Sequence, residues 1–329
     1  MSTAKPLRAD LVFEGGGVKG IALAGAYREL SDRGYQPECL AGTSAGAITA
    51  ALMAVGYSGP ELEDIVLHRM HFPDFEDHVF LDDFGKPGAV AEFLLHRGMH
   101  SGDYFLQWIR ALLQAKGKTK FGDLRNPPGS AANRQYRLQV IASDITARTM
   151  LVLPRDAAQL GIDDPDELEI AQAVRMSMSI PVFFEPVVFK NPKTGLDHVI
   201  VDGGLLSNYP LWLFDCPAGT PPQFPTFGMT LVPSGQPAPL QPEAEQPVSG
   251  SDVAFLKAIV STMLEGRDRF YIDADSFART IPIPTLGITT TDFDITPAQA
   301  QALFDSGKAA AAEFLKTWDF EAYKKRFRS

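Results

Sequence analysis

One serine lies in a pattern that is typical of a nucleophile. Residues Gly42–Gly46 read G-T-S-A-G, which matches G-x-S-x-G around Ser44. The short apolar run Cys39–Ala41 precedes the pattern, and the apolar stretch Ala45–Val55 follows it as a buried helix would. Between a strand and a helix this pattern forms a tight turn that holds the serine hydroxyl over the sheet edge. We therefore interpret Ser44 as a nucleophile, against the alternative of a glycine-rich turn with an incidental serine.

A run of three glycines, Gly15, Gly16 and Gly17, is the second candidate for chemistry. Their backbone N–H groups are not crowded by side chains, so the loop suits an oxyanion or a phosphate. With Gly20 it also matches G-x-G-x-x-G, the dinucleotide fingerprint. That use requires an acid at the carboxyl end of the next strand, whereas Glu38 precedes the next apolar run. The spacing favours an oxyanion loop, and a nucleotide-binding oxidoreductase is kept as the alternative.

Asp202 is the candidate base. It ends the predicted short strand 198–201 and is followed by Gly203 and Gly204. An abrupt turn at such a position can present a carboxylate, although Asp-Gly is also a common turn signal. The assignment therefore depends on the need of Ser44 for a base.

A histidine-dependent triad is the chemical alternative. In the order serine, acid, histidine, the residues that fit are Ser44, Asp144 and His198. His198 stands beside the charged Asp197 at the start of a strand, which is more typical of a solvated strand end. We therefore favour Asp202 as the base.

Composition argues against several other classes of protein. The net charge of −10 disfavours a nucleic-acid partner, which requires a basic face. The only two cysteines, Cys39 and Cys216, have neither disulfide nor metal-ligand spacing, and no histidine pair has the spacing of a zinc hydrolase. We expect no metal and no cofactor, and a reducing compartment.

The expected location is cytoplasmic, with peripheral contact to a membrane. The first residues contain no apolar segment of the secretory-signal kind. The longest apolar stretch, 45–55, is too short to span a bilayer. Because the chain as a whole is acidic, any membrane contact must rest on a local patch.

The elements that must position these residues alternate between strands and helices. The apolar patterns predict strands at 11–13, 39–41, 138–142, 150–153, 198–201 and 226–232, and helices at 21–30, 45–55, 168–178, 252–264 and 297–318. Strand, glycine turn and helix, repeated, indicate a parallel α/β sheet, which binds ligands at the carboxyl ends of its strands. We expect one domain over 1–329, in which nine prolines make much of 217–249 a surface loop and helices in 250–329 complete the fold.

The three motifs, in this order, resemble those of the patatin-like phospholipase family over residues 10–215. That family carries G-G-G-x-[KR]-G, then G-x-S-x-G, then D-G-[GA]. Ser179-Ile180-Pro181 and Asn208-Tyr209-Pro210 also match its pattern. The resemblance implies a three-layer α/β sandwich with a mostly parallel central sheet and helices on both faces. It implies the following site: Ser44 as nucleophile, Asp202 as proton acceptor, Gly15, Gly16 and Gly17 as oxyanion hole, and Gly20, Gly42, Gly46, Gly203 and Gly204 as motif glycines.

The activity implied by the resemblance is hydrolysis of lipid esters through an acyl-enzyme and a Ser–Asp dyad. Phospholipid, lysophospholipid and neutral glyceride are all open as substrates, presented on a membrane or micelle surface. A non-catalytic lipid-binding module on the same fold is a further alternative. Two segments have two interpretations each: Phe72–Phe93 is a flap or plain core, and Lys324–Arg328 is an anionic-lipid contact or a solvated tail.

Overall fold

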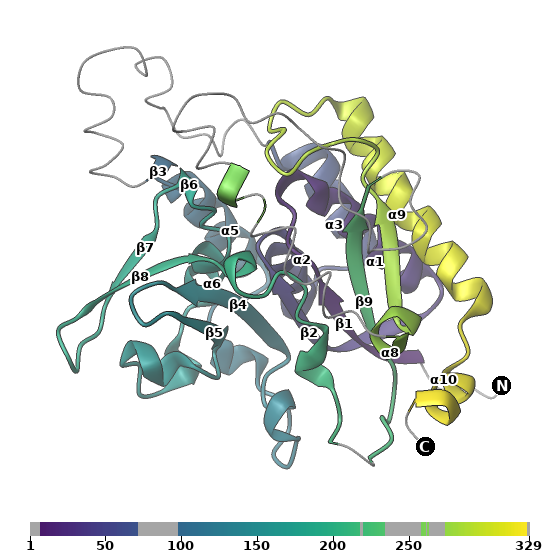
Figure 1. Cartoon of the computed structure of the whole chain (residues 1–329), viewed down its shortest axis with the longest axis horizontal. Helices are drawn as coiled ribbons and strands as arrows, with labels where there is room; N and C mark the ends of the chain where they lie inside the picture. The colour runs from purple at the N-terminus through teal and green to yellow at the C-terminus, as the bar shows by residue number, and fades with distance from the viewer. Residues whose placement is uncertain are drawn as a thin grey trace.

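The computed structural model describes residues 7–71, 98–217, 220–233, 258–260, 262 and 274–327. Its centre is an eight-stranded sheet, shown in Figure 1. Five neighbouring strands are parallel, in the order β10 (Thr280–Pro284), β9 (Thr226–Val232), β1 (Leu7–Phe13), β2 (Tyr35–Thr43) and β4 (Leu138–Asp144). Three antiparallel strands complete it: β5 (Thr149–Leu153), β8 (Asp197–Asp202) and β7 (Val187–Lys190). A separate pair joins β3 (Gly98–His100) to β6 (Val182–Phe184).

Helices cover the sheet. The α-helices are α1 (Ile21–Asp32), α2 (Ala45–Val55), α3 (Gly59–Asp64), α5 (Asp103–Ala115), α6 (Ile170–Ser177), α8 (Ala274–Ala278), α9 (Pro297–Thr317) and α10 (Phe320–Phe327). The larger core contains buried side chains of α1, α2, α6 and α9 and one face of the sheet. The opposite face packs against the segment that contains the short 3₁₀ helix Leu211–Phe214. The expected α/β class, with a mostly parallel sheet flanked by helices, is confirmed.

Among the described helices the longest is α9, which lies along α1 at the edge of the molecule (Figure 1). The two helices approach closely because each has a glycine at the contact. A Cβ on Gly25 would lie 2.0 Å from the carbonyl oxygen of Phe304, and one on Gly307 would lie 1.9 Å from that of Ala22. Either substitution by alanine would push the helices apart and open the core beneath them.

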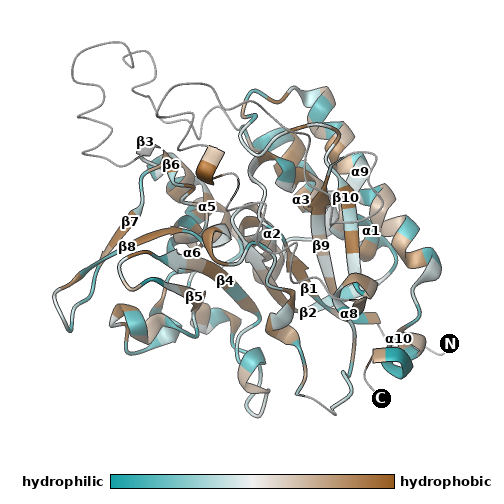
Figure 2. Ribbon diagram, viewed as in Figure 1, coloured by the Kyte–Doolittle hydropathy of each residue, from teal (hydrophilic) through white to brown (hydrophobic). Residues whose placement is uncertain are grey.

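The hydropathy of the chain follows this layering (Figure 2). The central strands are largely apolar, whereas the outer side of α9 and most of α10 are polar. Fully buried side chains include Phe13, Phe227 and Phe304, which come from two strands and one helix. Burial of each phenylalanine contributes on the order of 2–3 kcal/mol relative to exposure.

Four strands were not expected from the sequence: β3, β6, β7 and β10. The segment Thr280–Pro284 carries Pro282 and Pro284, which normally argue against a strand. It nevertheless forms β10 because it is the edge strand, where a missing N–H can face away from the sheet. The short strand β7 was also missed, because its four residues alternate between partly buried and exposed without a strong apolar run.

Several expectations lie outside the described residues: the segment 72–93, most of the loop 217–249, most of the helix 252–264, and Arg328. None of the helices in the described part of the chain is both long enough and apolar enough to cross a membrane.

Candidate active site

Two strands meet head to head on one edge of β4. On this edge Thr43 at the end of β2 pairs with Ile141, and Asp202 at the end of β8 pairs with the next residue, Ala142. The other edge of β4 is occupied by β5. Because β2 is parallel to β4 and β8 is antiparallel, their carboxyl ends point toward each other. The register of the sheet thus places Asp202 beside Ser44.

Ser44 adopts a strained backbone in a tight turn. Its φ of 52° and ψ of −124° lie in a region that residues other than glycine rarely adopt. A Cβ on Gly42 would lie 2.3 Å from the backbone of Gly46, so the turn tolerates no larger residue there. The Ser44 N–H donates to Oγ of Ser177 at 2.9 Å, and this hydrogen bond ties the turn to the end of α6. Helix α2 begins at the next residue, and its N-terminus favours negative charge near the hydroxyl.

Asp202 is buried and its pKa is raised. Its side chain is 0% exposed, and burial raises its pKa from 3.8 to about 7. Hydrogen bonding from the Ser44 hydroxyl and from the Gly204 N–H, at 2.7 Å to Oδ1, lowers the pKa in part. Oδ2 is buried and has no hydrogen bond of good geometry within the described structure, so it remains available for a proton. A carboxylate with a pKa near neutral is a competent general base at physiological pH.

The glycine loop lies against Ser44, and Asn208 holds it there. The Gly15 N–H donates to the Asn208 carbonyl at 3.0 Å, and the Asn208 side chain donates to the Gly15 carbonyl at 3.1 Å. A Cβ on Gly15 would lie 3.1 Å from Cβ of Ser44. The Gly15 N–H is therefore engaged in the loop itself. Among the described residues, the N–H groups of Gly16 and Gly17 have no protein acceptor, and they are the two that can serve an oxyanion.

Glu14 anchors the same loop to the neighbouring strand. Its carboxylate accepts hydrogen bonds at 2.5 Å from both the Thr230 hydroxyl and the Leu231 N–H, and at 3.3 Å from the Asn208 side chain. The sequence offered Asn208 only as a match to a pattern, without a role. The role of Glu14 and Asn208 is structural support of the loop.

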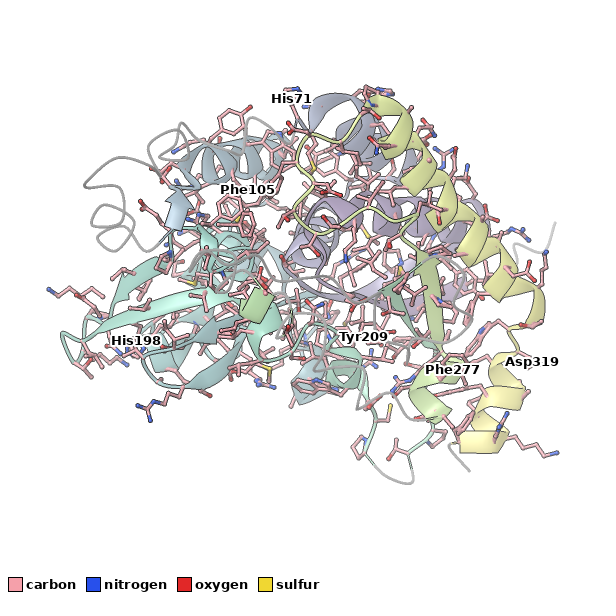
Figure 3. All side chains as sticks on the ribbon, turned by 45° about the horizontal axis from the view of Figure 1, so that its top comes forward. His71, Phe105, His198, Tyr209, Phe277 and Asp319 are labelled. Atoms are coloured by element: carbon pink, nitrogen blue, oxygen red, sulfur yellow. The ribbon has the colours of Figure 1, made fainter. Side chains whose placement is uncertain are left out.

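Two hollows meet at Ser44 and Ile180. The first is lined by polar groups, including Glu14, Lys19, Asp202 and Asn208. The second is lined by apolar side chains: Ile48, Met70, Phe105, Met178, Phe184 and Phe293. Phe105, labelled in Figure 3, is a fully buried residue of α5. An amphipathic ester has a polar head and an apolar acyl chain, joined at the ester group. A serine at the junction of a polar and an apolar hollow can reach that ester group.

The alternative triad is not assembled. Nδ1 of His198 does lie 2.5 Å from Oδ2 of Asp144, so the two residues form a buried pair. However, His198 stands four positions before Asp202 on the same strand, which places it roughly 13 Å away from the strand end that meets Ser44. Figure 3 shows His198 in the β7–β8 region of the molecule. The pair connects β8 to β4 and does not reach Ser44.

The raised pKa of Asp202 predicts the pH dependence of activity. Only the carboxylate form can accept the Ser44 proton, so kcat/KM should fall about tenfold per pH unit below an apparent pKa of about 7. Initial rates on a soluble short-chain ester between pH 5 and pH 9 measure this. A limb near pH 4, the ordinary range of an exposed carboxylate, would contradict the assignment of Asp202 as base.

The chain is similar to several known proteins. The family model for patatin-like phospholipases matches residues 11–215. The uncharacterized protein YqhO of Bacillus subtilis is 39% identical over 94% of this chain and 99% of its own length. Triacylglycerol lipase 4 of Saccharomyces cerevisiae is 28% identical over 57% of this chain and 20% of its own length. VipD from Legionella pneumophila, a solved structure, covers 96% of this chain and 68% of VipD with a TM-score of 0.48 and 16% identity. Because the family match spans more than half of the sequence and contains the glycine loop, the serine turn and the aspartate, this chain belongs to the patatin-like phospholipase family.

Proposed function

We propose that this protein hydrolyses lipid esters by two-step acyl transfer, with Ser44 as nucleophile and Asp202 as general base. The observation that carries the proposal is the meeting of β2 and β8. It places a strained serine turn and a buried carboxylate with a pKa of about 7 at the junction of a polar and an apolar hollow. Membership of the patatin-like phospholipase family supports lipid hydrolysis as the broad activity.

In the first step Asp202 accepts the hydroxyl proton while Oγ of Ser44 attacks the ester carbonyl carbon. The carbonyl oxygen becomes an oxyanion, which the N–H groups of Gly16 and Gly17 are placed to stabilise. Each such donor is typically worth ~3 kcal/mol of transition-state stabilisation. Collapse of the tetrahedral intermediate breaks the ester C–O bond, and the departing alcohol takes the proton from Asp202. The products are the free alcohol and an acyl-Ser44 ester.

In the second step Asp202 removes a proton from water, which attacks the acyl carbonyl through a second tetrahedral intermediate. The acyl C–O bond to Ser44 breaks, the proton returns to Oγ, and a fatty acid leaves. Every proton transfer in this cycle uses Asp202, so the mechanism needs no histidine.

The substrate class we propose is a phospholipid or lysophospholipid. The acyl chain would occupy the apolar hollow and the head group the polar hollow, where the Lys19 side chain provides a positive charge near a phosphate. A neutral glyceride is the second candidate, because a yeast relative is named a triacylglycerol lipase. A defined panel of both lipid classes, with released fatty acids identified by chain and position, decides between them. Binding to liposomes without any fatty-acid release would instead indicate a non-catalytic lipid-binding module.

An active-site probe tests the nucleophile directly. A fluorophosphonate should label Ser44 and leave Ser177 and Ser179 unmodified, because only Ser44 combines the strained turn with a helix N-terminus and an adjacent base. The other two serines are 0% exposed. Peptide mass spectrometry locates the adduct, and Ser44→Ala should abolish it. An adduct on Ser177 or Ser179, or none at all, would overturn the proposal.

A further inference from the structure

A buried arginine outside the catalytic motifs connects the base to both walls of the apolar hollow. Arg175 lies in the last turn of α6 and is 5% exposed. Its guanidinium donates to the carbonyl oxygens of Ser101, at 2.6 Å, and Glu185, at 2.9 Å. It also donates to the hydroxyl of Ser179. One side chain thus joins the end of α6 to Glu185 and to Ser101, which is distant in the sequence.

The first connection leads to the base. The Ser179 hydroxyl donates to the Arg175 carbonyl at 2.7 Å, so Arg175 and Ser179 are joined in both directions. The Ser179 carbonyl in turn accepts the N–H of Asp202 at 2.9 Å. Two residues earlier, the Ser177 hydroxyl accepts the N–H of Ser44. The short stretch from Arg175 to Ser179 therefore contacts the backbones of both catalytic residues.

The other two connections lead to the walls of the apolar hollow. Ser101 stands just before α5, which supplies Phe105 to the hollow. Glu185 directly follows Phe184, another lining residue, and the guanidinium lies 5.9 Å from the Phe184 ring centroid. A Cβ on Gly102 would lie 2.5 Å from Nε of Arg175, so the chain at the start of α5 passes directly over the guanidinium.

The chemistry of arginine matches this geometry. A guanidinium presents five N–H donors in a rigid planar fork, whereas an ammonium is a single point with flexible reach. Burying a cation is unfavourable, and apolar residues of similar volume often replace buried ionic groups without loss of stability. An arginine at position 175 is therefore better explained by its ability to hold several partners in place than by a contribution to the stability of the fold.

We propose that Arg175 is a positioning residue, which sets the placement of Asp202 against Ser44 and the separation of Phe105 and Phe184. The inference rests on the hydrolase function proposed above. It adds to that function a residue that controls both the rate and the selectivity for the acyl chain. Arg175 contacts neither ester nor nucleophile, and it acts through Ser179, Ser101 and Glu185.

The test compares Arg175→Lys with Arg134→Lys. Arg134 is a matched control because it is also largely buried, pairs with Asp10 and donates to the Phe214 carbonyl, but belongs to the other side of the sheet.

For folded Arg175→Lys we expect kcat on a soluble short-chain ester to fall at least about tenfold, with KM changed less than about threefold. The acid limb of kcat/KM should move to lower pH, because a loosened Asp202 is better solvated. The preference between short and long acyl chains should also weaken. Arg134→Lys should lower stability and change none of these three measurements.

A second variant guards against a folding failure at Arg175. Ser179→Ala removes only the hydroxyl between the guanidinium and the Arg175 carbonyl, so it should fold and shift kcat and the acid limb in the same direction by a smaller amount. If the wild type is active and Arg175→Lys keeps its rate, its pH limb and its chain preference, the inference is overturned while the proposed function stands. A wild type that neither hydrolyses esters nor reacts with a fluorophosphonate overturns both.

Discussion

Asp202→Asn is expected to lower kcat by at least about 10²-fold, because it removes the base while nearly preserving its shape. The amide can still accept the Gly204 N–H, so the turn after β8 should keep its form. His198→Ala should change kcat by much less, since His198 pairs with Asp144 and lies away from Ser44. Steady-state rates of both variants on one soluble ester measure the difference.

The same pair of substitutions distinguishes the dyad from the triad. In a triad, His198→Ala would be the severe lesion, and Asp144→Asn would reduce activity through the wrong imidazole tautomer. Circular dichroism and thermal unfolding of each variant show that it is folded, since a melted variant would mimic a lost base. A folded His198→Ala that is inactive, beside a folded Asp202→Asn that still turns over, would show that the dyad mechanism is wrong.

Asp202→Asn is also expected to stabilise the protein above pH 7. Burial raises the pKa of Asp202 from 3.8 to about 7, so between these two pH values the folded carboxyl holds a proton that the unfolded chain has released. The stability contributed by this proton is full below pH 3.8 and is lost as pH rises to about 7. The loss is about 1.4 kcal/mol per pH unit, or up to about 4 kcal/mol in all. Asparagine does not titrate, so the Asp202→Asn variant does not lose this stability as the pH rises.

Urea unfolding at pH 4, pH 6 and pH 8 measures the effect. The free energy of unfolding of Asp202→Asn minus that of the wild type should grow from pH 4 to pH 7 and then stay level. The more stable variant would also be the inactive one, which is the trade-off expected where an active site holds a strained, poorly solvated group. A difference that is constant over this range would mean that Asp202 titrates normally in the folded protein.

The sequence by itself determined the local parts of the site. The apolar run before Gly42 and the helix after Ser44 predicted the turn that the structure has, because glycines and apolar periodicity act within a few residues. The glycine loop and the Asp-Gly-Gly turn were predicted for the same reason. The α/β class followed from the repeated order of strand, glycine turn and helix, which these local patterns already contain.

Only the tertiary structure decided how these parts combine. Ser44 and Asp202 meet because β2 and β8 take neighbouring positions on one edge of β4, and strand register depends on the whole sheet. The sequence assigned all three glycines to the oxyanion hole, whereas a distant residue, Asn208, engages the Gly15 N–H. The sequence suggested a solvated strand end for His198, whereas the structure buries His198 in a pair with Asp144. The distance of this pair from Ser44 follows from the direction in which β8 runs. Such contacts arise between segments that are far apart in the sequence, and no local pattern encodes which of them will be neighbours.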